Sequence, residues 1–170
     1  MSLSKQASDY IKECSVHNVK VDKPTWEEYF ISMASLASTR SCDSQTKHGC
    51  VITDKKNRVL GIGYNSFPCK MPDDLLPNTR PRKYKWMVHA ERNALANCTI
   101  RPDDGIAYVT GTPCTDCVKS LYQEGIRSII CLDAHGTHLR EEEDEYILEI
   151  MQEYGGLKIK LIDPEKIKIT

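Results

Sequence analysis

The sequence predicts an α/β fold, specifically a three-layer α/β/α sandwich around a mixed five-stranded sheet. A polar four-residue turn separates two short apolar runs, which is typical of a β-hairpin. Helical and extended patterns then alternate to the end of the chain, as they do where helices connect parallel strands. With 170 residues, the chain can form one domain that buries a full core.

The chain starts with an arm. Residues 1–22 show weak periodicity and mixed charge, so we expect them to precede a single domain that spans residues 23–170. A helix should follow, with Asp22 as its cap and Pro24 in its first turn. Its apolar face is predicted from residues at helical spacing, namely Trp26, Phe30, Met33 and Ala37. Arg40 would then lie at its C-terminal end.

The remaining elements are a hairpin, a loop and an alternating series. We expect hairpin strands at 49–53 and 58–64 around the turn 54–57. Four prolines mark a long loop between 66 and 86, and loops of this length are often functional. Further helices are predicted at 89–96, 114–123 and 139–154, and further strands at 106–110, 128–132 and 157–162.

Two details of the alternating series can be predicted. Gly125 is a good C-terminal stop for the helix at 114–123. In the last helix, the acidic run at 141–144 is interpreted as a solvated helix start. Its apolar stripe is expected at Tyr146, Ile147, Ile150 and Met151.

Composition narrows the classes of function. The net charge is −1, which argues against a domain that holds long nucleic acid by its phosphates, because such domains are basic. No run approaches the roughly 18 apolar residues that span a bilayer, and residues 1–10 lack the apolar core of a signal peptide. The eight cysteines occur in a chain longer than most disulfide scaffolds. We therefore expect mostly free thiols, a reducing cytoplasmic compartment and no membrane partner.

One pair of motifs carries chemistry, His89-Ala90-Glu91 and Pro113-Cys114-Thr115-Asp116-Cys117. His89, Cys114 and Cys117 make a three-ligand set that leaves one position of tetrahedral zinc open, as in catalytic zinc sites. Water in that position has a pKa of about 7, so hydroxide is available, and Glu91 can relay its proton. The ligands fall at two predicted helix N-termini, whose dipoles favour thiolates at both cysteines. A closed structural site, with Glu91 or another cysteine as fourth ligand, is the alternative.

The combination of H-x-E with P-C-x-x-C is the signature of zinc-dependent nucleobase deaminases. Over residues 26–162 the chain further resembles the deoxycytidylate deaminases, which convert dCMP to dUMP and ammonia. The resemblance is carried by residues 43–50, by Gly61-Ile62-Gly63-Tyr64-Asn65-Ser66-Phe67-Pro68, by Asp73-Asp74 and by the zinc motif. It implies that zinc-bound hydroxide attacks C4 of cytosine, while Glu91 protonates N3 and passes a proton to the leaving ammonia.

The resemblance also implies which residues bind substrate. Asn65 would hydrogen-bond the sugar, at its 3′-hydroxyl. The 5′-phosphate needs positive and hydroxyl donors, for which the loop before the first strand offers Arg40, Ser44, Thr46 and Lys47. Ordinary surface charge is the alternative for Arg40 and Lys47. The remaining candidates lie beside the zinc motif or after the fourth strand, namely Ala90, Thr112, Pro113 and His135. Asn93 is expected to orient loops.

Members of this family are often hexamers that dCTP activates and dTTP inhibits. The resemblance places the effector site at Gly63, Tyr64, Asn65 and the pair Asp73 and Asp74, with His48 nearby. The two aspartates would hold Mg²⁺ that bridges a triphosphate, or would instead cap loop amides. The expected partners are therefore dCMP, the two effectors and further copies of the chain. The product would serve pyrimidine nucleotide biosynthesis, in a cell or in the host cytoplasm of a virus.

Departures from the family pattern and other functions compatible with the motif remain open at this stage. The family usually has Val-Gly-Ala at His48-Gly49-Cys50 and Gly-Cys at Lys70-Met71. The motif also fits deamination of free cytidine, guanine, a riboflavin precursor or tRNA adenosine. An editor of tRNA would show a more basic surface. A zinc-stabilised binding module without catalysis is the alternative outside the enzymes, and such a module would have little need for Glu91.

Overall fold

Five strands form the centre of the computed structural model, which describes residues 3–19, 21–132 and 142–167. The strands are β1 (Gly49–Thr53), β2 (Val59–Tyr64), β3 (Ile106–Val109), β4 (Ser128–Leu132) and β5 (Lys158–Ile162). They lie in the order β2-β1-β3-β4-β5. β1 pairs antiparallel with β2 and β3, whereas β3, β4 and β5 run parallel to one another. The predicted mixed five-stranded sheet is confirmed.

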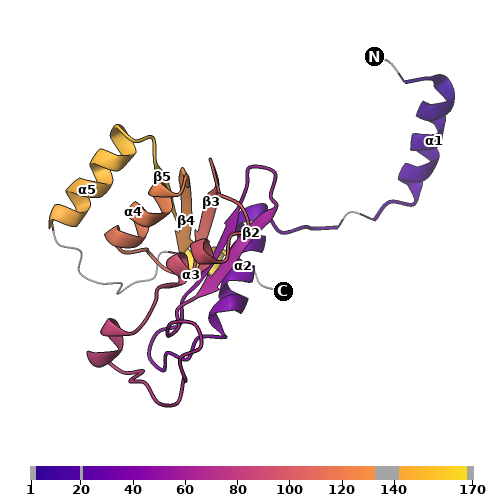
Figure 1. Cartoon of the computed structure of the whole chain (residues 1–170). Helices are drawn as coiled ribbons and strands as arrows, with labels where there is room; N and C mark the ends of the chain where they lie inside the picture. The colour runs from indigo at the N-terminus through magenta and orange to yellow at the C-terminus, as the bar shows by residue number, and fades with distance from the viewer. Residues whose placement is uncertain (1–2, 20, 133–141, 168–170) are drawn as a thin grey trace.

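Helices cover both faces of this sheet and complete three layers (Figure 1). One face carries α2 (Trp26–Ser38), and the other carries α3 (Ala90–Ala96), α4 (Thr115–Gln123) and α5 (Glu142–Glu153). Successive strand residues point to opposite faces, so the two cores alternate along each strand. Cys50, Ala107 and Ile129 pack under α3, α4 and α5, whereas Val51, Tyr108 and Ile130 pack under α2. The sandwich prediction is therefore confirmed.

The arm contains a helix that its weak periodicity did not indicate. This helix, α1 (Lys5–Val16), starts at Ser4, whose hydroxyl accepts a hydrogen bond from the Ala7 N–H at 3.3 Å. No residue of α1 is buried. Figure 1 shows it apart from the sheet, at the end of an extended segment. The helix of the arm therefore contributes no residue to the buried core.

The cap of α2 differs from the expected one. Thr25, not Asp22, is the capping residue, and Pro24 lies before the helix instead of in its first turn. The Glu28 N–H donates to Thr25 Oγ1 at 3.2 Å, while the Thr25 N–H donates to the Glu28 carboxylate at 2.6 Å. This reciprocal capping box satisfies two backbone donors, the N–H groups of Thr25 and Glu28. A cap at Asp22, three residues earlier, would leave both groups without these partners.

The apolar stripes of α2 and α5 match the expected ones only in part. In α2, Phe30 is buried but Trp26 is 57% exposed. In α5, Leu148 is the buried residue, whereas Tyr146 and Ile150 are 52% and 57% exposed. Periodicity identifies a helix, but the side that becomes buried depends on how the helix crosses the sheet. Residues 139–141 of the predicted helix lie outside the described part of the chain.

The turn between β1 and β2 has the predicted position. Asp54 Oδ1 accepts hydrogen bonds from the N–H groups of Lys56 at 2.8 Å and Arg58 at 2.9 Å, and Asn57 has a φ of 60°. The long loop after β2 is tied back where Ser66 pairs with Val88 in an isolated bridge. It also contains a short 3₁₀ helix, η1 (Arg82–Lys85), which the sequence pattern did not indicate.

The cysteines divide between core and surface. All eight lie in the described ranges, and each is a free thiol. Cys50, Cys117 and Cys131 are buried, whereas Cys14 and Cys69 are exposed. Every helix found in the described ranges is too short or too polar to cross a membrane.

Glycines in β2 let α3 lie directly against the strand. A Cβ added at Gly61 would lie 2.3 Å from the Ala94 carbonyl oxygen, and one at Gly63 would lie 2.2 Å from the Ala94 nitrogen. Both contacts are with helix backbone, which cannot move away as a flexible side chain could. The two glycines therefore set how closely α3, whose N-cap is His89, approaches the sheet.

Gly61→Ala should lower the free energy of unfolding by about 1–3 kcal/mol, because the added methyl group forces α3 away from β2. Urea denaturation followed by circular dichroism measures this loss. Gly156→Ala is the matched control, since an added Cβ there meets nothing within 4 Å although φ is +66°. Its loss should be about 1 kcal/mol, from backbone strain alone. A Gly61→Ala variant as stable as the wild type would contradict the close-packing explanation.

Candidate active site

Three metal-ligating side chains meet at the N-termini of α3 and α4. His89 is the N-cap of α3, Cys114 is the N-cap of α4, and Cys117 lies in the first turn of α4. Their ligand atoms all lie within 4.8 Å of one another. His89 Nδ1 is 3.5 Å from Cys114 Sγ and 3.3 Å from Cys117 Sγ. The structure therefore brings together the ligand set predicted from the motif.

Backbone geometry leaves these ligand atoms available. His89 has φ −70° and ψ 153°, and Cys114 has φ −70° and ψ 159°, so both N-caps are extended. Neither side chain hydrogen-bonds the N–H groups of its own helix. The imidazole and the thiol are thus free to turn toward a metal ion. The N-terminal ends of both helices face the same point, and their partial positive charge favours thiolate.

Without a metal ion, the two thiols share their protons unequally. A hydrogen bond from Cys117 lowers the pKa of Cys114 to about 4. The same bond, together with burial, raises the pKa of Cys117. A hydrogen bond with Cys114 raises the pKa of His89. Both sulfurs would be thiolates with a metal ion bound, because a coordinating thiol is deprotonated.

The donor set fits a zinc ion with an open position. One imidazole nitrogen and two sulfurs are zinc ligands, and three protein ligands are the number found in catalytic zinc sites. Within the described ranges, the group of candidate ligands consists of His89, Cys114 and Cys117, and Glu91 is outside it. This arrangement agrees with an open site.

Glu91 is buried next to the metal ligands. Its side chain comes from the first turn of α3, is 5% exposed, and lines the same cavity as His89. Burial raises the pKa of its carboxyl group. A carboxyl group with a raised pKa gains and loses a proton closer to neutral pH, as general acid–base catalysis requires.

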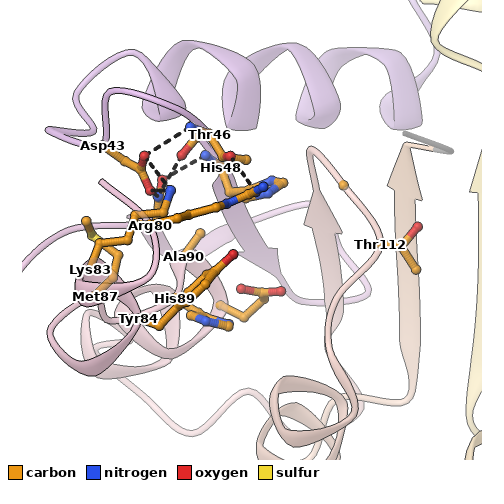
Figure 2. Close-up of a pocket in the computed structure, with 13 residues that line it drawn as sticks. Asp43, Thr46, His48, Arg80, Lys83, Tyr84, Met87, His89, Ala90 and Thr112 are labelled. Atoms are coloured by element: carbon orange, nitrogen blue, oxygen red, sulfur yellow. Dashed lines mark hydrogen bonds and ion pairs between the residues drawn. The ribbon is translucent and has the colours of Figure 1, made fainter. Parts of the chain in front are cut away.

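The cavity opens from the metal ligands toward the loops that precede β1 and α3 (Figure 2). Its lining consists of Asp43, Thr46, His48, Asn65, Arg80, Lys83, Tyr84, Met87, His89, Ala90, Glu91, Gly111 and Thr112. Among the predicted substrate residues, the lining includes Thr46, Asn65, Ala90 and Thr112 and does not include Arg40, Ser44, Lys47 or Pro113. His135 lies outside the described residues.

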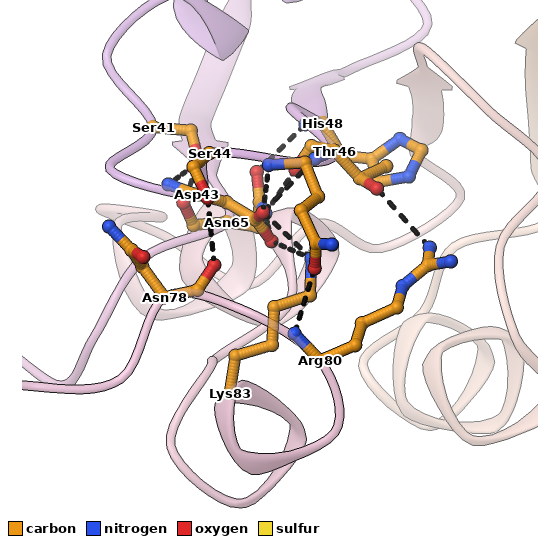
Figure 3. Close-up of polar contacts among 10 residues, drawn as sticks. Ser41, Asp43, Ser44, Thr46, His48, Asn65, Asn78, Arg80 and Lys83 are labelled. Carbon is orange, nitrogen blue, oxygen red and sulfur yellow. Dashed lines mark hydrogen bonds and ion pairs between the residues drawn. The ribbon is translucent and has the colours of Figure 1, made fainter.

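Asn65 is held by a hydrogen-bond network at the wall of this cavity (Figure 3). Its side-chain Nδ2 donates to Asp43 Oδ2 at 3.2 Å and to the Thr46 carbonyl at 2.9 Å. Its Oδ1 accepts from the His48 N–H at 2.7 Å. Both amide protons are thus used inside the protein, whereas Oδ1 keeps a second lone pair. Asn65 can therefore accept a further hydrogen bond but cannot donate one.

A buried ion pair that the sequence did not reveal supports the same wall. Lys83 Nζ lies 2.7 Å and 2.6 Å from the two carboxylate oxygens of Asp43, and both side chains are 3% exposed. Burial alone would raise the pKa of Asp43. Hydrogen bonds from Lys83 and from the N–H groups of Gln45 and Thr46 outweigh burial and hold that pKa below its usual value.

Arg80 is a second basic residue that sequence reasoning missed. Its Nη2 donates to Thr46 Oγ1 at 3.3 Å, and its guanidinium carbon is 5.9 Å from the centre of the Tyr84 ring. Tyr84 and Met87 also line the cavity without having been predicted. The available signal was the basic run Arg80-Pro81-Arg82-Lys83, which lies shortly before the metal-binding motif.

The predicted effector residues are divided between the cavity and other positions. His48 lines the cavity, with its ring against Gly111, where an added Cβ would lie 2.7 Å from Cε1. Gly63 is buried beneath α3, where an added Cβ would clash with the helix backbone. Close packing therefore explains why a glycine occurs at this position. Tyr64, Asp73 and Asp74 lie outside the lining, and both aspartates are exposed.

Asn93, in α3, hydrogen-bonds to the end of β2 and to the loop after it, which is the orienting position that we expected. Its Nδ2 donates to the Tyr64 carbonyl at 2.7 Å and to Ser66 Oγ at 3.1 Å. These bonds hold the start of the long loop against α3.

A mixed five-stranded sheet with one imidazole and two thiols at two helix N-termini, beside a buried glutamate, defines a zinc-dependent nucleobase deaminase site. Residues 24–133 match the family model of the cytidine and deoxycytidylate deaminase zinc-binding region. The chain belongs to this family.

Several proteins that are similar to this chain are named deoxycytidylate deaminase or dCMP deaminase. The deoxycytidylate deaminase of Homo sapiens is 38% identical over 152 residues, which cover 85% of this chain and 84% of the human protein. The Mus musculus deoxycytidylate deaminase is 32% identical over 152 residues, with the same coverage of both chains. The dCMP deaminase of cyanophage S-TIM5 in apo form has a TM-score of 0.62 at 23% identity, covering 83% of this chain and 100% of that chain. Its structure in complex with dCMP and dUMP has a TM-score of 0.60 at 22% identity, covering 84% of this chain and all of that chain. These structural similarities confirm the fold.

Lys83→Met should lower the free energy of unfolding by about 3–5 kcal/mol at pH 7, because the Asp43 carboxylate stays buried without its cation. Since the folded pKa of Asp43 is depressed, the pair contributes fully above the unfolded pKa of about 4 and loses its contribution as pH falls through the folded value. Urea denaturation at several pH values measures both effects.

The control for this variant is Lys85→Met, which removes an exposed lysine from the same 3₁₀ helix. Its effect should stay within about 0.5 kcal/mol. Equal stability of the Lys83→Met and Lys85→Met proteins at pH 7 would show that the buried pair does not stabilise this wall.

Proposed function

We propose that this protein hydrolyses dCMP to dUMP and ammonia. The observation that carries the proposal is Glu91, a buried carboxyl group outside a three-ligand metal set and inside the cavity beside it. Family membership supports deamination. The names of the human and mouse relatives, and the dCMP and dUMP in the cyanophage complex, support dCMP as the substrate.

Glu91 is the proposed catalytic acid and base. Zinc held by His89, Cys114 and Cys117 would supply Lewis-acid activation of the attacking water when bound. Glu91 accepts a proton from that water, protonates N3 of cytosine and delivers a proton to the departing amino group. A C4–O bond forms and the C4–N bond breaks, so water and dCMP yield dUMP and ammonia. The raised pKa of Glu91 supports both roles, because the group must hold the proton between two transfers.

The rest of the cavity would position the nucleotide. Ala90 and Thr112 line it and are proposed to contact the base. Pro113 and His135 stay proposed substrate residues from the resemblance alone. Asn65 Oδ1 is proposed to accept a hydrogen bond from the 3′-hydroxyl, in the direction that its internal bonds leave open. The phosphate would lie toward the loop that contains Arg40, Ser44, Thr46 and Lys47, of which Thr46 lines the cavity.

The assembly, the regulation and the compartment are further parts of the proposal. Residues 23–170 would form the catalytic domain and residues 1–22 an arm, which the absence of buried residues in α1 supports. The functional unit would be a homo-hexamer, activated by dCTP and inhibited by dTTP. His48, Gly63, Tyr64 and Asn65 would form the effector site, with Mg²⁺ at Asp73 and Asp74. Eight free thiols support a reducing cytoplasmic compartment.

Glu91→Gln should bind one zinc ion per chain, as the wild type would, because Glu91 is not a ligand. Ammonia release from dCMP should fall by about 10²–10⁴-fold, since the amide cannot relay protons. Metal analysis and a coupled ammonia assay measure the two quantities on the same sample. Glu124→Gln is the control, because Glu124 is exposed at the end of α4 and outside the cavity. Full turnover by Glu91→Gln would refute the proposed role.

A substrate panel tests the proposed function itself. Wild-type protein should release ammonia fastest from dCMP among dCMP, dCTP, deoxycytidine and CMP, because the proposed site binds a deoxynucleoside monophosphate. Saturating dTTP with Mg²⁺ should lower the dCMP rate. Equal rates with deoxycytidine and dCMP would contradict the nucleotide assignment, and an unchanged rate with dTTP would contradict the proposed regulation.

A further inference from the structure

We propose that Arg80 binds the 5′-phosphate of the substrate and makes the site specific for nucleotides over nucleosides. This inference rests on the proposed function, since it assigns the recognition of one group of the proposed substrate. Arg80 takes the place of the loop cations Arg40 and Lys47 as the proposed source of positive charge for the phosphate, because neither of those two residues lines the cavity.

The argument begins with the charges around the cavity. Its lining contains one lysine and one arginine, Lys83 and Arg80. Lys83 is already neutralised, since both carboxylate oxygens of Asp43 lie within 2.7 Å of its Nζ. Within the described ranges, Arg80 forms no ion pair. The cation of the lining that can meet an incoming anion is therefore Arg80.

The guanidinium group is also oriented into the site. Figure 3 shows Arg80 reaching Thr46, where Nη2 donates to Oγ1 at 3.3 Å. In Figure 2 the side chain extends toward His48, another residue of the lining. This single bond to a neutral hydroxyl uses one of five N–H donors, and a phosphate can accept two of the others in parallel. Arginine matches phosphate in this bidentate way, whereas lysine acts as a point charge.

Backbone contacts hold Arg80 beside the loop that contains Thr46. The Arg80 N–H donates to Gln45 Oε1 at 2.8 Å, and Ser44 Oγ donates to the Asn78 carbonyl at 3.2 Å. These bonds use the main chain of residues 78 and 80, so the arginine side chain remains available. A backbone anchored before the ligand arrives reduces the ordering that binding would otherwise require.

The test compares a nucleotide with the matching nucleoside. The variants are Arg80→Ala, Arg80→Lys and the control Arg82→Ala, which removes an exposed arginine of the same segment outside the cavity. For Arg80→Ala, kcat/KM with dCMP should fall by about 10- to 100-fold, mainly through a higher KM, because a charged hydrogen-bonding partner is lost. The fall with deoxycytidine should be much smaller. Arg80→Lys should be intermediate, and Arg82→Ala should stay within about twofold of the wild type.

Calorimetry can measure the affinities of dUMP and deoxyuridine for the same zinc-loaded proteins. This comparison tests phosphate recognition by Arg80 without turnover. Arg80→Ala should weaken dUMP binding by a similar factor and change deoxyuridine binding much less. If the wild type releases no ammonia from dCMP, the proposed function fails, while the dUMP comparison still tests phosphate recognition by Arg80. Equal losses for nucleotide and nucleoside, or no loss with either, would overturn the assignment.

Discussion

Two helix N-termini must meet at one point for this protein to hold a metal ion. The imidazole comes from the N-cap of α3, and the two sulfurs come from the first residues of α4. α3 is placed by its close approach to β2, where Gly61 and Gly63 leave no side chain between strand and helix. α4 is placed by the parallel pair that it connects, β3 and β4. The metal centre therefore depends on helix–sheet packing as much as on the three ligands.

Two buried carboxyl groups near this centre, those of Glu91 and Asp43, have different surroundings and opposite pKa shifts. Glu91 is buried, which raises its pKa and suits it to proton transfer. Asp43 is buried with Lys83 and with backbone donors, which lowers its pKa and makes it a fixed support. Both carboxyl groups line one cavity. Their environments separate a reactive acid from a structural one, as differences in burial and hydrogen bonding do in other active sites.

The parts of this molecule that could be predicted from sequence are those encoded locally. β4 has its predicted bounds, and the ligand set was predicted from its spacing, because each half of the motif lies within a few residues. Contacts between distant segments could not be predicted. Lys83 and Asp43 are 40 residues apart, and Arg80 and Thr46 are 34 apart, so no local pattern links them. The buried side of α5 was missed for a similar reason, since the crossing of helix and sheet decides it.

The central claim is a zinc ion held by one imidazole and two thiolates, with its fourth position left for water. X-ray absorption spectroscopy of the zinc-loaded protein measures this coordination most directly. We predict two sulfur neighbours at about 2.3 Å, with one imidazole nitrogen and one oxygen at about 2.0–2.2 Å. A third sulfur or a second imidazole would mean that the protein itself closes the site, and it would contradict the account.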